Sequence, residues 1–380
     1  MDWDAEGLLN DLPDEPARDA RAKLLDELHE DGVSVEELRE AVTEQRLTLL
    51  PTERLLGGEA SYTAREVAEK SGLGLESLLA TRRALGLAVP GPDDAIFNDD
   101  DLAAAKIGVK VREAGFDEDH VLETNRVLGR GMSRFAEALR TISAELLLEP
   151  DADELELAHR FASLAEAQLP LTREWLQHVF VMHFRQMLRN EAVTMQERTT
   201  GRGDARDQAI AFADIVGFTE LGESVGVEEL GNVAARLSRL AGDVVESPVR
   251  VVKTIGDAVM LVAPKPADIV AATLDLVERA EAEEDFPALR AGVAYGPAVN
   301  QWGDWFGSTV NLASRLTARA RPESVLVTEA VREAAGDERF GWSSAGPKRL
   351  KGITEPVKTF RARRPGSDGA GTGSGNGAKG

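Results

Sequence analysis

Two aspartates in the second half of the chain could together hold a metal ion. Asp214 directly follows the apolar run 209–213, and Asp257 follows Gly256 inside the stretch 249–262. If that stretch forms a hairpin beside the run, both carboxylates reach the same edge of a sheet. Carboxylate and turn carbonyl oxygens suit Mg²⁺ or Mn²⁺, and a pair of such ions promotes phosphoryl chemistry. Aspartate is also common in hairpin turns, so a purely structural role stays open for this residue alone.

A second group of polar residues could bind a phosphate and a ribose. Asn311 and Arg315 lie four residues apart in a predicted helix over 308–319, so they project from one face. The guanidinium of Arg315 could hold phosphate oxygens in a fork, and Asn311 could orient a ribose oxygen. Asp304 precedes this helix in a loop. An ordinary polar helix surface would give the same pattern, and these residues alone do not decide between the two.

Lys253 could contribute to the recognition of a base. It lies four residues before Asp257 in a predominantly apolar strand. A lysine donor with an aspartate acceptor matches N1 and the N6 amino group of adenine, whereas guanine presents the reverse pattern. A site that must satisfy buried polar groups discriminates strongly against the wrong base. A GTP-converting enzyme would therefore need different residues here.

The elements that must position these residues alternate between strands and helices. Strands are predicted over 209–213, 249–255, 258–262, 288–295 and 324–328, and helices over 228–246, 267–284 and 308–319. Strands with interspersed helices of this kind indicate an α+β fold with a mostly antiparallel sheet.

Three segments that contain the polar residues closely resemble the class III nucleotidyl cyclases. They are Phe212-Ala213-Asp214-Ile215-Val216-Gly217-Phe218-Thr219, Lys253-Thr254-Ile255-Gly256-Asp257 and Asp304-Trp305-Phe306-Gly307-Ser308-Thr309-Val310-Asn311-Leu312-Ala313-Ser314-Arg315. The resemblance covers about residues 207–363 and is specific, because six polar residues of the required types stand in the right order. It implies a catalytic domain with a ferredoxin-like core.

The resemblance implies a metal-dependent conversion of ATP to cyclic AMP. Asp214 and Asp257, with Ile215, would bind two divalent cations, Mg²⁺ or Mn²⁺. The ribose 3′-hydroxyl would attack the α-phosphorus in line while pyrophosphate leaves; one metal would activate the hydroxyl and both would brace the phosphates. No protein nucleophile is needed, which agrees with the absence of cysteine.

The resemblance also assigns the other polar residues and implies a dimer. The assignments are the adenine-selecting pair Lys253 and Asp304, the transition-state pair Asn311 and Arg315, and Lys351, which resembles a lysine that reaches the triphosphate. The family builds its site across a head-to-tail dimer, with the metal aspartates from one chain and the other four residues from its partner. All six are present here, so a homodimer would carry two complete sites. A guanylate cyclase is the other enzyme to consider, and Lys253 with Asp304 opposes it.

The first 190 residues are predicted to form an all-α regulatory and dimerisation domain. Apolar residues recur at helical spacing over 119–148, 155–167 and 171–195, with Pro170 separating the last two helices. Stripes this dense pack against other helices, within the chain or across a dimer. This half also resembles, more diffusely, the regulatory domain of actinobacterial cyclases, several of which respond to pH.

A segment at about 61–107 resembles a helix-turn-helix and raises an alternative function. Thr63 would cap the first helix, Gly72 would supply the turn, and a second helix would span 75–85. The chain would then be a DNA-binding transcriptional regulator with a nucleotide-sensing cyclase-like domain. Residues 61–110 hold six basic and eight acidic side chains, however, so they offer little phosphate neutralisation. A structural or dimerisation role is favoured.

The histidines suggest a regulatory signal. All five precede residue 200: His29, His120, His159, His178 and His183. Histidine is the side chain that most readily changes charge between pH 5 and 8. His178 and His183 lie in the apolar helix before the catalytic domain, where protonation could shift helix packing. Ordinary, satisfied helix histidines remain the alternative.

Composition and the chain ends exclude several classes of protein. With 66 acidic and 44 basic residues, the net charge of −22 opposes binding to nucleic acid or anionic membranes without a local basic site. No apolar run reaches the ~18 residues needed to cross a bilayer, and the acidic start lacks the features of a signal peptide. We expect a cytoplasmic protein with a linker at 191–206 and a disordered, glycine-rich tail at 364–380.

Overall fold

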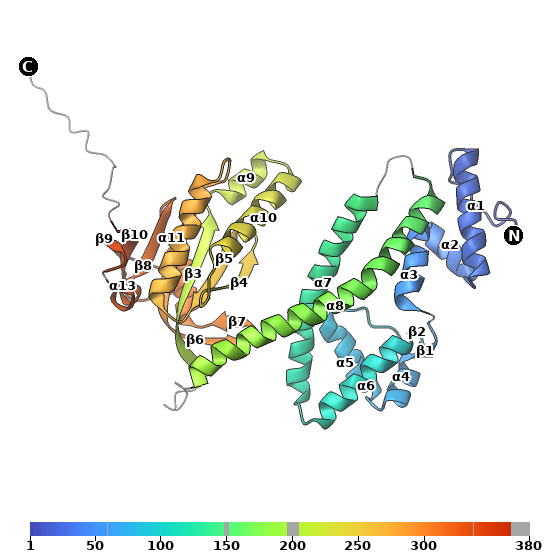
Figure 1. Cartoon of the computed structure of the whole chain (residues 1–380), viewed down its shortest axis with the longest axis horizontal. Coiled ribbons are helices and arrows are strands. Elements are labelled where there is room, and N and C mark those ends of the chain that lie inside the picture. Colours follow the sequence, from blue (N-terminus) through green and yellow to red (C-terminus); the bar gives the residue numbers. More distant parts are fainter. Residues whose placement is uncertain (59, 148–151, 196–204, 337, 366–380) are drawn as a thin grey trace, which may run out of the picture. The chain divides into compact units, whose positions relative to one another are not determined.

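The computed structural model describes residues 1–58, 60–147, 152–195, 205–336 and 338–365, which fall into two compact units. The first unit spans Met1–Leu188 and the second spans Arg189–Gly380. Figure 1 shows that helices build the first unit and that a sheet lies at the centre of the second. The expected helical region followed by an α+β domain is confirmed.

The first unit begins with a small helical core. Helices α1 (Glu15–Glu30), α2 (Val35–Thr43) and α3 (Leu50–Gly57) follow one another, with a 3-10 turn between the last two. The stripe expected on α1, Leu24, Leu25 and Leu28, is buried in this core. Arg21 on the same helix binds Glu154, whose carboxylate oxygens lie 2.7 Å from Nε and 2.6 Å from Nη2. These contacts join α1 to the start of α8 (Glu154–Met195).

The helix-turn-helix segment forms as expected in its local detail. Thr63 and Glu66 make a reciprocal capping box at the start of α4 (Ala64–Ser71), and Gly72 ends that helix with φ 78°. Helix α5 (Leu75–Leu85) follows, and α6 (Asp99–Glu113) completes a small core. The sequence did not predict the short antiparallel pair of β1 (Tyr62–Thr63) and β2 (Ala95–Phe97), an exception to the helical architecture.

The prediction that Pro170 separates two helices is wrong. After α7 (Glu118–Leu147), helix α8 runs without a break from Glu154 to Met195 with Pro170 inside it. Proline lacks an N–H and clashes with the carbonyl four residues earlier, a cost of about 3 kcal/mol that is confined to one turn. Ending the helix there would instead leave several backbone groups on each side without partners. The continuous helix is therefore a reasonable outcome.

The second unit is built on an eight-stranded sheet. Its strands run in the order β4-β5-β3-β6-β8-β10-β9, with β7 paired to β6, and every pairing is antiparallel except that of β6 with β8. The strands are β3 (Ala205–Ile215), β4 (Arg250–Ile255), β5 (Ala258–Ala263), β6 (Leu289–Gln301), β7 (Asp304–Phe306), β8 (Ser324–Thr328), β9 (Gly341–Lys348) and β10 (Val357–Arg363). The helices are α9 (Phe218–Ser224), α10 (Val227–Asp243), α11 (Pro266–Ala282), α12 (Ser308–Thr317) and α13 (Glu329–Ala335).

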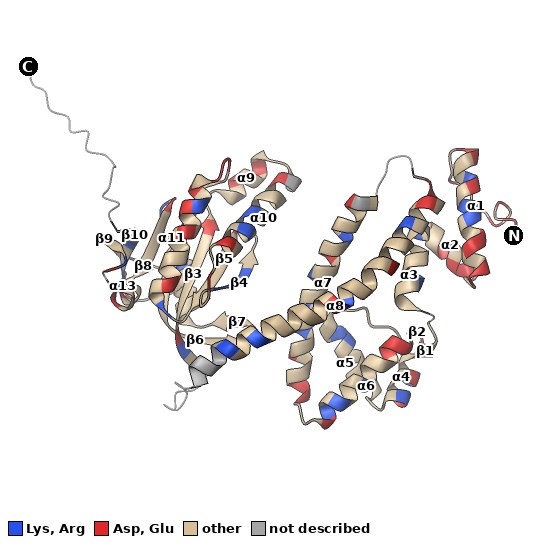
Figure 2. Cartoon of the chain, in the orientation of Figure 1, with Lys and Arg blue, Asp and Glu red and all other residues tan. Residues whose placement is uncertain are grey.

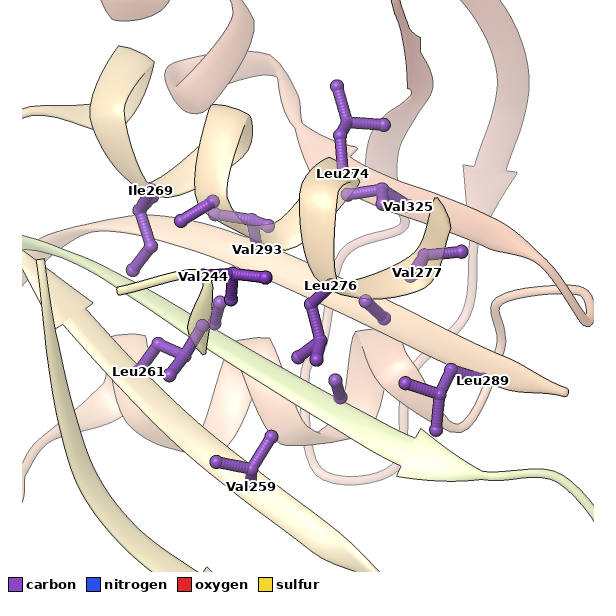
Figure 3. Close-up of a cluster of buried hydrophobic side chains, with 14 of the residues drawn as sticks. Val244, Val259, Leu261, Ile269, Leu274, Leu276, Val277, Leu289, Val293 and Val325 are labelled. Atoms are coloured by element: carbon purple, nitrogen blue, oxygen red, sulfur yellow. The ribbon is translucent and has the colours of Figure 1, made fainter. Parts of the chain in front are cut away.

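Side-chain alternation gives this sheet two different faces. Ala209, Ala211 and Ala213 of β3 join a large cluster with buried residues of α10, α11 and α13, which we call the core face; Figure 3 shows part of it. Ile210 and Phe212 point the other way and pack with residues of α12, which we call the α12 face. The same strand therefore serves two layers.

Both ends of the second unit differ in detail from expectation. Helix α8 extends to Met195 and β3 starts at Ala205, so the predicted linker 191–206 overlaps two regular elements, and its middle lies outside the described residues. Arg364, in the predicted tail, forms an ion pair with Asp275. It also pairs with Glu278, whose Oε1 lies 3.3 Å from the arginine Nε. Residues 366–380 also lie outside the described part.

A membrane span is absent from the described part of the chain. None of its helices combines the length and the apolar composition needed to cross a bilayer.

Candidate active site

The expected hairpin forms beside β3 and brings Asp214 and Asp257 together. Strand β5 pairs with β3 so that Asp214 lies opposite Ala258, and Asp257 sits in the turn between β4 and β5. The backbone N–H of Ile215 donates to the carbonyl of Asp257 at 3.0 Å. The side chain of Ile215 is buried in the core face, so only its backbone is available at this edge.

An arginine that sequence reasoning did not single out binds one of these aspartates. Arg290 of β6 lies directly opposite Asp214 in the β3–β6 register. Its Nε and Nη2 donate to the same oxygen, Oδ2 of Asp214, at 3.0 and 2.6 Å. Burial, followed by the neighbouring Asp214 carboxylate, raises the pKa of Asp257, while Arg290 acts in the opposite direction. Negative charge is therefore crowded at this edge of the sheet.

The donor set fits a divalent cation whose coordination is completed by a ligand. Among the described residues, no group of three or more histidine, aspartate or glutamate side chains could hold an ion by itself. Asp214 and Asp257 supply two hard carboxylates, and Mg²⁺ commonly binds through one or two carboxylates together with substrate phosphates. Their mutual repulsion would fall when a cation binds.

Lys253 and Asp304 form an ion pair within one chain. Lys253 of β4 lies opposite Met260, which packs on the α12 face, and its Nζ contacts Oδ2 of Asp304 on β7. The other oxygen, Oδ1, accepts the backbone N–H of Trp305 at 2.8 Å. The two side chains are 37% and 31% exposed, so a ligand can reach both. The predicted donor and acceptor are thus brought side by side.

Helix α12 is held close to the sheet by small residues. A Cβ on Gly292 of β6 would lie 2.3 Å from the backbone nitrogen of Thr317, so only glycine permits this approach. The hydroxyl of Thr317 donates to the carbonyl of Phe212 at 3.1 Å, and that of Thr309 to Pro297 at 2.8 Å. These contacts occupy the inner side of the helix.

The outer side of α12 carries the other two predicted residues. Asn311 is exposed and Arg315 is half-buried, and neither belongs to the contacts described above between α12 and the sheet. Gly352, with φ 73°, lies so close to Arg315 that a Cβ there would be 3.4 Å from both Nη atoms. The adjacent Lys351 is exposed. The structure therefore places the Lys351-Gly352 loop beside the Arg315 guanidinium.

Comparisons with known proteins account for nearly the whole chain. Residues 1–188 match the family described as "Adenylate cyclase regulatory domain", and residues 204–362 match "Adenylate and Guanylate cyclase catalytic domain". A pH-sensitive adenylate cyclase of Mycobacterium tuberculosis (strain CDC 1551 / Oshkosh) is 45% identical over 371 residues, which are 96% of this chain and 92% of that protein. The chain belongs to the class III adenylate cyclases.

Two further likenesses accompany this assignment. An adenylate cyclase of Streptomyces coelicolor is 32% identical to the present cyclase over 285 residues, 73% of each chain. Among solved structures, the adenylyl cyclase CyaB from P. aeruginosa aligns with 42% of this chain and 94% of its own, with 23% identity and a TM-score of 0.34.

The predicted site residues of the cyclase form separate groups within one chain. Asp214 and Asp257 stand with Arg290, while Lys253 stands with Asp304. Among the described residues, no hydrogen bond or ion pair joins either aspartate to Asn311 or Arg315. All the groups nevertheless belong to the α12 face of the sheet or its edge.

Sequence reasoning missed three residues of the cyclase that matter to this geometry. Arg290 left one signal, a lone charge in an otherwise apolar strand, which is the same signal that singled out Lys253. Gly292 and Gly352 left none, because a glycine shows its role only once its spatial neighbours are known.

Proposed function

We propose that this adenylate cyclase converts ATP to 3′,5′-cyclic AMP and pyrophosphate, as a homodimer with its sites at the interface. The observation that carries the proposal is the Lys253–Asp304 pair, a donor and an acceptor side by side on the sheet that also bears Asp214. Adenine offers an acceptor at N1 and a donor at N6, so it can use both side chains. Guanine offers the reverse pattern at these positions, which opposes a guanylate cyclase.

The chain's own side chains account for positioning and charge balance. In the reaction, a bond forms between the ribose 3′-oxygen and the α-phosphorus, the bond from that phosphorus to pyrophosphate breaks, and the hydroxyl proton passes to water. Asn311 orients the ribose, while Arg315 balances the charge that develops around the α-phosphate. Lys351, next to Gly352, binds the triphosphate in this proposal. Two divalent ions held by Asp214 and Asp257 would polarise the phosphates and lower the pKa of the attacking hydroxyl.

Two features support a homodimer. Inside the described part of one chain, no hydrogen bond or ion pair joins the aspartates to Asn311 or Arg315, which suits a site completed by a second copy. Exposed apolar side chains also lie near Lys253 and Asp304. Ile255, two positions after Lys253, and Phe306, two positions after Asp304, are each 52% exposed. A second copy would cover these side chains.

The direct test measures ATP-to-cyclic-AMP turnover by full-length protein and by residues 200–380, with Asp214→Ala as the blank and GTP as the competing substrate. Activity on ATP that disappears in the blank supports the catalysis. Absence of turnover with both Mg²⁺ and Mn²⁺ would refute it. A difference between the two lengths gives the sign of regulation.

Mixing two inactive variants tests the dimer separately. Asp214→Ala and Arg315→Ala affect opposite halves of a shared site. If chains exchange freely, half of the dimers are mixed and each has one intact site, so about a quarter of the wild-type activity should return. Activity that stays at the level of the separate variants would contradict a shared site.

Regulation by pH is the finer part of the proposal. It is supported by the relative named as pH-sensitive and by the five histidines of the first unit. His178 and His183 lie exposed on α8, beside large exposed apolar side chains such as Trp175 and Phe180 that a second copy would cover. His159 lies 2.6 Å from a carboxylate oxygen of Glu27. Replacing His178 and His183 by glutamine should flatten the activity profile between pH 5.5 and 8; an unchanged profile would exclude this pair.

The DNA-binding alternative finds little support. Helix α5, the second helix of the helix-turn-helix, packs against α7, where a Cβ on Gly129 would lie 2.3 Å from the carbonyl oxygen of Leu85. Figure 2, in which the ribbon is coloured by residue type, marks acidic residues among the basic ones on α4 and α6. A recognition helix needs a free face and basic neighbours. We assign this segment a structural role.

A further inference from the structure

We propose that Arg319 and Arg349 bind the two terminal phosphates of ATP, the part of the substrate that leaves as pyrophosphate. This inference rests on the proposed function, because it extends the nucleotide site of that function. It adds two cations to the pair that the proposed function already places at the phosphates, Arg315 and Lys351.

The proposed contacts with ATP follow one another along the chain. Asp304, shortly before α12, would meet the adenine, Asn311 the ribose and Arg315 the α-phosphate. Base, sugar and first phosphate are therefore met in order toward the C-terminal end of the helix. The backbone N–H of Arg319 donates to the carbonyl of Leu316 at 2.9 Å, so the helical turn continues to this residue. Arg319 thus lies one turn beyond Arg315, about 6 Å along the axis, in the direction of the remaining phosphates.

A buried leucine brings Arg349 to the same end of the helix. Leu350 is 5% exposed and belongs to one apolar cluster with Leu316 and Ala320. Each of these two cluster residues directly follows an arginine of the α12 segment. Arg349 directly precedes Leu350, and its own side chain is exposed. The packing of the leucine therefore holds Arg349 beside the last turn of α12.

Neither arginine is neutralised by a carboxylate. Arg236 and Arg339 of the same unit each bind an acidic side chain. In the part of the chain that the structure describes, no ion pair joins Arg319 or Arg349 to an aspartate or glutamate. The planar guanidinium presents donors in a fork that matches two phosphate oxygens. Both side chains can therefore offer their donors to an anion.

The surrounding sequence adds no negative charge. Residues 305–322 contain three basic residues and residues 339–354 contain four, and neither stretch contains an aspartate or a glutamate. The chain as a whole has a net charge of −22 and repels a polyanion at long range. ATP therefore needs a local basic site, and these two stretches meet at the cluster around Leu350.

The two products of the reaction distinguish a phosphate contact from a structural effect. Pyrophosphate carries both terminal phosphates of ATP, whereas cyclic AMP keeps only the α-phosphate. Loss of Arg319 or Arg349 should therefore weaken the binding of ATP and pyrophosphate and leave that of cyclic AMP unchanged. A displaced α12 would weaken the binding of all three.

Product inhibition of the full-length enzyme is the main test. In Arg319→Gln and in Arg349→Gln, the inhibition constant of pyrophosphate and the KM for ATP should each rise about fivefold, because an exposed charged contact is lost. The inhibition constant of cyclic AMP should stay at the wild-type value. Since the lost contact is made equally in the ground state and the transition state, kcat should not fall by more than about twofold.

Arg363→Gln is the matched control. This exposed arginine ends β10 (Val357–Arg363), about 20 Å along the strand from the loop that contains Arg349. The control changes the net charge equally, so all four constants should stay at their wild-type values. Isothermal titration calorimetry with pyrophosphate and Mg²⁺, without nucleotide, should give the same order of affinities independently of turnover.

The outcomes separate this inference from the proposed function. Pyrophosphate constants that stay unchanged in both variants, or that rise together with the constant for cyclic AMP, overturn the inference. If one variant does not fold, the other decides, because the two arginines lie on different elements. Wild-type protein that makes no cyclic AMP would refute the proposed function. Pyrophosphate affinity that falls in the two variants and not in the control would still support the basic site.

Discussion

The two faces of the catalytic sheet are built from the same strands but differ in what covers them. On the core face, alternate residues of β3 pack beneath α10, α11 and α13 in one continuous apolar cluster. On the α12 face, a single helix covers part of the sheet, and two ion pairs, Lys253 with Asp304 and Arg290 with Asp214, lie beside it. Successive side chains of a strand point to opposite faces. One face can therefore supply stability while the other supplies chemistry.

The largest effect on activity should come from the α12 face. Asp214→Asn removes the charge of a proposed metal ligand but keeps its size, so we expect kcat/KM for ATP to fall by about 10³-fold or more. The melting temperature should change little, because the relief of crowding with Asp257 is offset by the loss of the ion pair with Arg290. Cyclic AMP assays and thermal unfolding check both statements. If the variant keeps a tenth of the wild-type activity, Asp214 is not a ligand of the proposed metal site.

Gly292→Ala should affect stability and activity together, although the residue lies on the α12 face. The new Cβ would lie 2.3 Å from the backbone nitrogen of Thr317, so α12 must move and carry Arg315 with it. We expect kcat to fall by about 10²-fold and the free energy of unfolding by about 1–3 kcal/mol.

A glycine-to-alanine control for this variant lies on α10. A Cβ at Gly231 meets nothing within 4 Å. Gly231→Ala should leave activity unchanged and, because alanine favours helix, stabilise the fold by up to about 1 kcal/mol. If the two variants show the same activity and stability, the close approach of α12 to Gly292 does not matter for either property.

A smaller effect on turnover is expected at Gly352. Alanine there would contact the guanidinium of Arg315 and would also occupy a backbone conformation with φ 73°. We expect kcat to fall about fivefold to tenfold, with KM for ATP within about twofold of wild type. Gly346 has the same φ and no neighbour within 4 Å, so Gly346→Ala carries the backbone strain alone. If both variants lose the same activity, the contact with Arg315 is irrelevant.

A core-face substitution should change stability and leave the chemistry intact. Leu276 of α11 is fully buried in the core face. Leu276→Ala should lower the free energy of unfolding by about 2–5 kcal/mol. At 15 °C, where the variant remains folded, kcat and KM should stay within about twofold of wild type. Chemical denaturation and steady-state assays test the two parts, and a large change in kcat would show that the faces are coupled.

The smallest expected effect is a difference in stability between wild type and Asp257→Asn that depends on pH. Burial and the Asp214 carboxylate raise the pKa of Asp257 in the folded chain. The stability that the protonated form contributes is complete below the unfolded value and is lost as pH rises through the raised folded value. In metal-free protein the variant should therefore melt slightly higher than wild type at pH 7.5, and the difference should vanish near pH 3.5. A variant that melts lower at pH 7.5 would contradict the sign.

Short-range patterns in the sequence were sufficient for much of this architecture. The hairpin around Gly256 follows from turn residues between apolar runs, and the helix cap at Thr63 follows from its spacing to Glu66. Local signals can also mislead. Pro170 marks a weak point in a helix, but it does not reveal whether the helix continues beyond that point.

Contacts between distant segments could not be predicted in the same way. Arg290 reaches Asp214 across 76 positions of sequence, and only the register of β3 with β6 brings them together. Gly352 meets Arg315 because the loop after β9 returns to α12. The predicted polar residues could be singled out by their types and order, whereas the residues that hold them in place required the folded chain.

The way α12 packs on the sheet affects which substitutions this enzyme can tolerate. The helix is fixed by its buried apolar side chains, by the close approach at Gly292 and by the hydroxyls of Thr309 and Thr317, none of which is proposed to touch substrate. The residues that would touch it, Asn311 and Arg315, project from the outer side and add little to the fit. Mutation can therefore explore new side chains at these two positions without unfolding the domain. The catalytic repertoire of the scaffold is open to evolution, and to design, at almost no cost in stability.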